Sequence, residues 1–184
     1  MENEDKRVWD DETIGRVYGI MDEILYSIAL YRAIRPWDRD DSCYDPFLRE
    51  FWIRISNNAI QMAIINWCKI FGKEHNNRTH YSHFVTPERF TDKLDKQVYE
   101  ELWDGMLNVR DKFAAHEDDI KDRKKIPDLN QAMEVMEAFR ETTQEEYDIP
   151  ELPPIKTMYE AYQIRIQDQL QKCRIDWEIP EMDE

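Results

Sequence analysis

One amphipathic segment ends with an arginine and a histidine that are close together in the sequence. Five residues separate Arg110 from His116, and Asp111 directly follows the arginine. At about 100° per residue the two side chains leave a helix roughly 120° apart, on either side of its apolar stripe. A histidine transfers protons near neutral pH, and a guanidinium stabilises charge on phosphoryl oxygens. The pattern therefore predicts phosphodiester chemistry, with Arg110 and His116 as the active pair.

A purely structural interpretation of the same residues remains open. Arg110 would then pair with a neighbouring carboxylate such as Asp111 or Glu117, and His116 would complete the end of the helix, where a positive charge is favourable.

The densest basic cluster lies in the segment after His116. Basic residues in such a position can bind an RNA backbone. Together with the helical Lys112, the candidate RNA-binding residues are Lys121, Arg123, Lys124 and Lys125. The alternative is a solvated loop in which these cations balance the preceding acidic residues 117–119.

Three histidines and a glutamate lie in a polar connector between two predicted helices. The residues are Glu74, His75, His80 and His83. Histidines at such spacing can ligate Zn²⁺ or another divalent ion, but neither an HExxH motif nor a cysteine partner accompanies them. The histidines could instead line an RNA cleft, or the connector could simply pack Tyr81 and Phe84 onto the core. Our main interpretation requires no metal and no cofactor.

The elements that carry these residues are predicted to be helices. The 184 residues are 41% hydrophobic and include only four glycines, which argues against a β-sandwich or a glycine-rich nucleotide fold. Apolar residues recur every three or four positions, and caps or prolines separate the segments. We expect one all-α bundle of about five helices. They should cover residues 11–34, 46–72, 95–116, 128–147 and 155–170, with a short helix near 87.

The expected organisation is a single domain with two acidic ends. Residues 1–9 form an N-terminal arm, residues 10–175 the bundle, and residues 176–184 a C-terminal tail. The helix starting at Pro46 has the least polar face, so it should be the most buried.

The formal net charge is −15, which disfavours binding to duplex DNA. Residues 50–95 carry +1, so this middle part repels an anion least. Cys43, Cys68 and Cys173 lack CxxC spacing and are expected to be reduced thiols. The acidic start does not fit a signal peptide, and no apolar run is long enough to span a membrane. We therefore expect a cytoplasmic protein without a membrane partner.

The segment from Arg110 to His116 resembles the R-X4-6-H signature of HEPN domains, which are small helical bundles common in RNA-cleaving toxins and defence systems. The preceding core helix ends in the stretch Ile65-Asn66-Trp67-Cys68-Lys69-Ile70-Phe71-Gly72, and a histidine-bearing connector follows it. This ending is similar to the abortive-infection branch of that superfamily. With the helix order, the resemblance covers roughly residues 10–170.

The resemblance implies a metal-independent endoribonuclease that leaves a 2′,3′-cyclic phosphate. His116 would move the proton, Arg110 would hold the phosphate, and Asp111 would orient Arg110 or polarise the 2′-hydroxyl. It also implies a homodimer with a composite site and an antitoxin or other protein partner. The acidic residues around His116 favour an alternative, in which the chain is a non-catalytic helical protein-interaction module.

Overall fold

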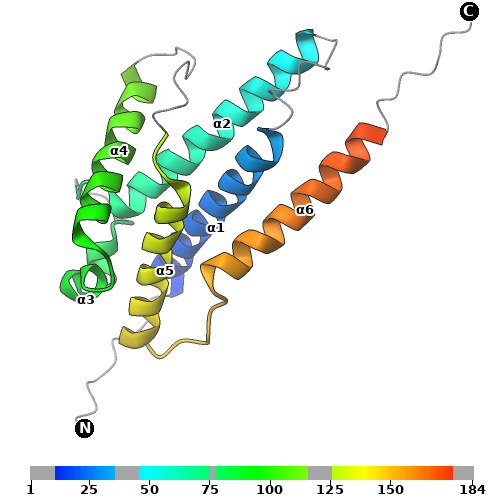
Figure 1. The fold of residues 1–184 in the computed structure, drawn as a ribbon. Coiled ribbons are helices and arrows are strands. Elements are labelled where there is room, and N and C mark those ends of the chain that lie inside the picture. Colours follow the sequence, from blue (N-terminus) through cyan, green and yellow to red (C-terminus); the bar gives the residue numbers. More distant parts are fainter. Residues whose placement is uncertain (1–10, 36–45, 75–77, 116–125, 176–184) are drawn as a thin grey trace, which may run out of the picture.

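The computed structural model describes residues 11–35, 46–74, 78–115 and 126–175, and this part of the chain is all-α (Figure 1). Within these ranges, five long helices and the short α3 form a bundle, and the 3₁₀ turn η2 precedes α3. This confirms the predicted fold class. The elements are α1 (Asp11–Ile34), α2 (Pro46–Phe71), η2 (Tyr81–His83), α3 (Pro87–Thr91), α4 (Lys96–Ala115), α5 (Leu129–Glu146) and α6 (Ile155–Ile175).

Helix α1 lies between α2 and α6 (Figure 1). Its buried side chains follow the predicted spacing of three and four residues, as Val17, Met21, Ile24 and Ile28 show. The hydroxyl of Tyr162 on α6 also donates a hydrogen bond to Asp22 on α1. The long helices therefore form a layer in which α1 is covered on two sides.

Most of the buried side chains of α2 lie in its C-terminal half. Trp67 and Phe71 are fully buried, whereas Phe47 near the start is 84% exposed. The expectation that α2 is the most buried helix fails at its first turns, where Phe47 and Phe51 are exposed. The described helices pack against its second half, and the apolar side chains of the first turns face outward because none of those helices covers them.

Gly72 ends α2 because no side chain fits at this position. A Cβ atom here would lie 2.3 Å from the carbonyl oxygen of Cys68. The Gly72 N–H donates to that same oxygen at 3.0 Å, so the backbone is too close to allow a substituent. The chain then leaves the helix and enters the polar connector.

Aromatic rings join α2, α3 and α5. The ring of Phe71 stacks on Phe90 at 5.9 Å and meets Phe139 edge-on at 5.8 Å. Such pairs contribute about 0.5–1.5 kcal/mol each beyond the burial of their area. The cluster fixes the end of α2, from which the connector and its histidines start.

Asp128 caps α5 as the sequence predicts, because its carboxylate accepts a hydrogen bond from the Asn130 N–H at 2.8 Å. In the middle of α5, the carboxylate of Glu137 accepts from the N–H of Ile155, the first residue of α6, at 2.8 Å. No helix within the described ranges is long and apolar enough to cross a membrane. The two predicted terminal arms lie outside those ranges.

Candidate functional site

Arg110 lies near the C-terminal end of α4 and is held by its neighbour in the sequence. Its Nε and Nη2 atoms donate to Asp111 Oδ1 at 2.9 and 2.6 Å, and the arginine side chain remains 31% exposed. Two of the five guanidinium N–H donors therefore point at one carboxylate oxygen. Both the catalytic and the structural interpretation of the motif predict this ion pair. It fixes the geometry of Arg110 but does not distinguish the two interpretations.

Cys68 of α2 lies close enough to Arg110 and Asp111 for both charges to affect it. Burial raises the pKa of this free thiol to about 12, and the nearby Arg110 charge offsets only part of that effect. The thiol is protonated at neutral pH and is not a nucleophile. Arg110 therefore lies near the second half of α2, where its charge acts on the buried Cys68.

The structure brings together only part of the predicted site. Arg110, Asp111 and the exposed Lys112 lie on one helix, which is described as far as Ala115. His116 and the basic residues Lys121, Arg123, Lys124 and Lys125 lie outside the described residues. The described part of the motif therefore contains Arg110, whose guanidinium is held by Asp111. Its helix, α4, is described as far as the residue before His116.

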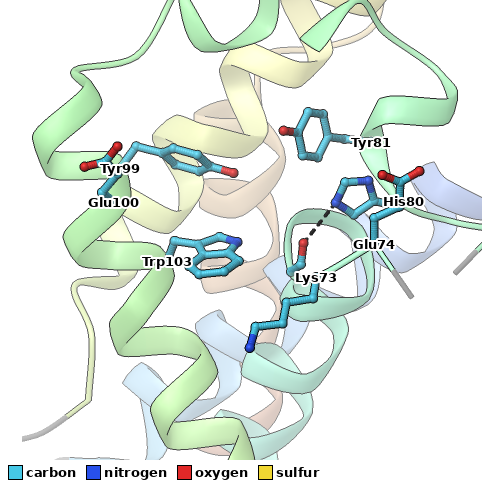
Figure 2. A pocket seen from close by; sticks show the side chains of 8 residues that line it. Lys73, Glu74, His80, Tyr81, Tyr99, Glu100 and Trp103 are labelled. Carbon is cyan, nitrogen blue, oxygen red and sulfur yellow. Dashed lines mark hydrogen bonds between the residues drawn. The ribbon is translucent and has the colours of Figure 1, made fainter. Parts of the chain in front are cut away.

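A cavity of about 430 Å³, which the sequence motifs did not predict, lies beside α4 where the connector leaves α2 (Figure 2). Tyr99 and Trp103 line it from α4, one helical turn apart. Figure 2 shows Tyr81 directed at Tyr99 from the opposite side. The other residues that line this Trp103 pocket are Gly72, Lys73, Glu74, His80 and Glu100.

His80 forms part of the pocket wall as a neutral ring in one tautomer. The Gly72 carbonyl can only accept, so His80 Nε2 donates to it at 2.9 Å. His80 Nδ1 therefore accepts from Ser82, whose Oγ lies 2.8 Å away and whose N–H lies 3.4 Å away. Burial lowers the pKa of His80, although the bond to Gly72 and the charge of Glu74 offset part of this effect. The ring is fixed in place by hydrogen bonds at both nitrogens.

The two tyrosine hydroxyls of the pocket are protonated at physiological pH. Burial raises the pKa of Tyr81 and of Tyr99. Trp103 is held as well, because its Nε1–H donates to the Phe71 carbonyl at 2.8 Å. The inner wall is therefore uncharged and aromatic.

No group of three or more histidine, cysteine or acidic side chains in the described ranges is arranged to hold a metal ion. His80 uses both ring nitrogens in protein hydrogen bonds, and His83 lies 3.7 Å from Glu74. His75, the third member of the suggested cluster, lies outside those ranges.

A second, smaller groove of about 310 Å³ crosses α1, α2 and α6. Tyr26, Met62 and Tyr162 give it an apolar floor, and Asp22 and Glu23 make one side acidic. Lys69 donates to Asn66 at 2.7 Å, and Asn66 donates to Glu23 at 3.0 Å, so polar contacts link α2 to α1 along this side. The sequence showed the apolar residues but not that they meet on one face.

The fold thus defines an all-α helical bundle with a guanidinium on α4 and a neighbouring aromatic pocket. Comparison of the chain with protein-family models, with curated proteins and with solved structures finds no match in any of the three.

Proposed function

We propose that this chain is a metal-independent endoribonuclease of the HEPN type. The observation that supports the proposal most is the placement of Arg110, which Asp111 holds at two nitrogens while about a third of its side chain stays accessible. A fixed and partly exposed guanidinium suits a phosphate group, because its planar donors match phosphoryl oxygens.

In the proposed reaction, the ribose 2′-oxygen attacks the adjacent phosphorus and the bond from phosphorus to the 5′-oxygen breaks. His116 moves the proton from the 2′-hydroxyl to the departing 5′-oxygen. Arg110 stabilises the negative charge that grows on the phosphoryl oxygens, and Asp111 orients Arg110. The products are a 2′,3′-cyclic phosphate and a 5′-hydroxyl, and no metal is needed.

RNA is the proposed substrate, and Lys112 and the basic residues after His116 would bind its backbone. The proposed assembly is a cytoplasmic homodimer with two copies of the motif in one cleft, controlled by an antitoxin or another protein partner.

The test is incubation of the purified protein with labelled structured RNA in EDTA. We expect fragments with 2′,3′-cyclic phosphate ends from the wild type and none from Arg110→Ala or His116→Ala. Arg165→Ala, which removes an exposed arginine on α6, is the matched control and should cleave normally. Unchanged cleavage by His116→Ala would refute the catalytic assignment.

A second candidate function, a non-catalytic protein-interaction module, is favoured by exposed apolar side chains. Phe51 and Met62 on α2 and Ile164 on α6 are all exposed, and the acidic groove lies between these helices. A module of this kind would bind a protein partner through these side chains. Its binding would be insensitive to Arg110→Ala and would be lost on Phe51→Ser with Ile164→Ser.

A further inference from the structure

We infer that the Trp103 pocket binds one base of the RNA, beside the phosphate held at Arg110. This inference rests on the ribonuclease proposed above and extends it to a substrate subsite. The ligand class is a nucleotide with an amino-bearing base. The pocket contributes a stacking surface, the cation Lys73 and two carboxylates, Glu74 and Glu100.

The size and walls of the pocket suit a flat ring. Its volume of about 430 Å³ lies within the usual range of small-ligand sites. Tyr99 and Trp103 on α4 and Tyr81 opposite them supply three aromatic side chains from two elements (Figure 2). Aromatic side chains stack on nucleic-acid bases irrespective of base identity.

The inner groups carry no charge that a base would have to displace. Hydrogen bonds fix the neutral ring of His80, and burial raises the pKa of Tyr81 and of Tyr99, so both phenols are uncharged. Trp103 is already held by the Phe71 carbonyl. An uncharged ring can therefore enter without stranding a buried ion, which would be costly.

The rim carries the charges that a nucleotide needs. No carboxylate within the described residues pairs with Lys73, so its ammonium is available to a phosphate. Glu100 follows Tyr99 on the exposed rim and can accept a hydrogen bond from an exocyclic amino group. Uracil has no such amino group, so the pocket should prefer adenine, guanine or cytosine.

The position of the pocket relative to Arg110 fits a single strand. Trp103 and Arg110 are seven residues apart on α4, which places them on one face and roughly 10 Å apart along the axis. Both lie against the second half of α2, since Trp103 bonds to Phe71 and Arg110 lies near Cys68. One oligonucleotide can reach both places.

Titration with mononucleotides tests the subsite without requiring cleavage. The probes are AMP, UMP and ribose 5-phosphate, and the readout is the indole ¹⁵N–H signal of Trp103, assigned with Trp103→Phe. We expect AMP to shift this signal and to bind roughly tenfold more tightly than ribose 5-phosphate, because stacking is worth more than 1 kcal/mol per base. Equal affinity of AMP and ribose 5-phosphate would refute base binding.

Two rim variants keep the inference testable without disturbing the core. Lys73→Gln should weaken AMP binding roughly fivefold, the size of an exposed ion pair, whereas Lys156→Gln on α6 should leave it unchanged. Glu100→Gln should reduce the preference for AMP over UMP. Its control is Glu160→Gln, because each glutamate forms an exposed pair at 4.0 Å with a lysine four residues earlier. Unchanged AMP binding by Lys73→Gln would overturn the assigned phosphate contact.

The outcomes separate the two proposals. RNA cleavage that depends on Arg110, without AMP binding at Trp103, refutes the subsite and leaves the ribonuclease standing. AMP binding at Trp103 with no RNA cleavage refutes the proposed ribonuclease, on which the inference of an RNA subsite rests. Binding and cleavage together, both reduced by Lys73→Gln, support the subsite as part of the RNA site.

Discussion

The Nε2–H of His80 donates to the carbonyl oxygen of Gly72 at 2.9 Å, and this bond ties the polar connector back to the end of α2. The two residues are eight positions apart, and neither lies within a helix. The bond satisfies a carbonyl that the helix end would otherwise leave without a partner. It also orients the imidazole as part of the wall of the Trp103 pocket.

The burial of His80 makes stability depend on its protonation. Burial lowers the pKa of His80 in the folded protein, so the unfolded chain binds the proton more readily. Stability should therefore be complete above the unfolded pKa of about 6.5 and should decline as the pH falls below it, by at most about 1.4 kcal/mol per pH unit. Urea denaturation of wild type and His80→Gln between pH 5 and 8 measures this, and identical pH profiles would contradict the prediction.

Gly72 should not tolerate any side chain. Gly72→Ala would place a Cβ 2.3 Å from a backbone oxygen that cannot move away easily, and we expect a loss of about 2–4 kcal/mol in the free energy of unfolding. Gly19→Ala is the control, because a Cβ in that turn of α1 meets no atom within 4 Å. That variant should gain about 0.5–1 kcal/mol, since alanine favours a helix. Equal effects in chemical denaturation would refute the steric argument.

The ion pair between Arg140 and Glu137 should contribute more to the free energy of unfolding than a surface ion pair with the same N–O distance. Both this pair and the pair between Arg54 and Glu50 have N–O distances of 2.6 Å, but the side chain of Arg140 is only 10% exposed and that of Arg54 is 74% exposed. Arg140 also donates to the Leu152 carbonyl at 3.1 Å. We expect Arg140→Ala to cost about 3 kcal/mol and Arg54→Ala less than about 1 kcal/mol in thermal or urea unfolding.

The same pair should contribute to acid sensitivity. Burial raises the pKa of Glu137, but the bonds from Arg140 and from the Ile155 N–H outweigh it and lower the pKa overall. A depressed carboxyl pKa gives stability that is present above the unfolded value and is lost as the pH falls through the folded value. Glu137→Gln should therefore flatten the loss of stability below about pH 4.5. If the stability of Glu137→Gln fell with pH as steeply as that of the wild type, the prediction would be contradicted.

Arg110→Lys should show how much of the RNA cleavage rate depends on the positive charge and how much on the planar guanidinium. Lysine keeps the charge but lacks the planar donors that bind Asp111 and that, in the proposed reaction, would also bind the phosphate. We expect the rate to fall about 100-fold, with the fold retained because the side chain is partly exposed. Single-turnover cleavage measures the rate, and circular dichroism checks the fold. A wild-type rate in Arg110→Lys would mean that only charge is needed.

Much of the fold could be read from local patterns. The stripe of α1, the start of α2 at Pro46 and the Asp128 cap of α5 each depend on residues within one or two turns of each other, and all three are present in the structure. The ion pair between Arg110 and Asp111 is equally local, because the two residues are adjacent. Helix periodicity and capping depend on residues close together in the chain, so they can be predicted from one sequence alone.

The Trp103 pocket and the exposed start of α2 could not be predicted from local sequence patterns. Lys73, Tyr81 and Trp103 come together only because Gly72 ends α2 and the connector returns to it through His80. The apolar start of α2 would suit a core equally well, and only the packing of the other helices decides that Phe47 faces outward. Residues far apart in the sequence meet through the crossing of helices and the path of loops, and neither is encoded in the spacing within one helix.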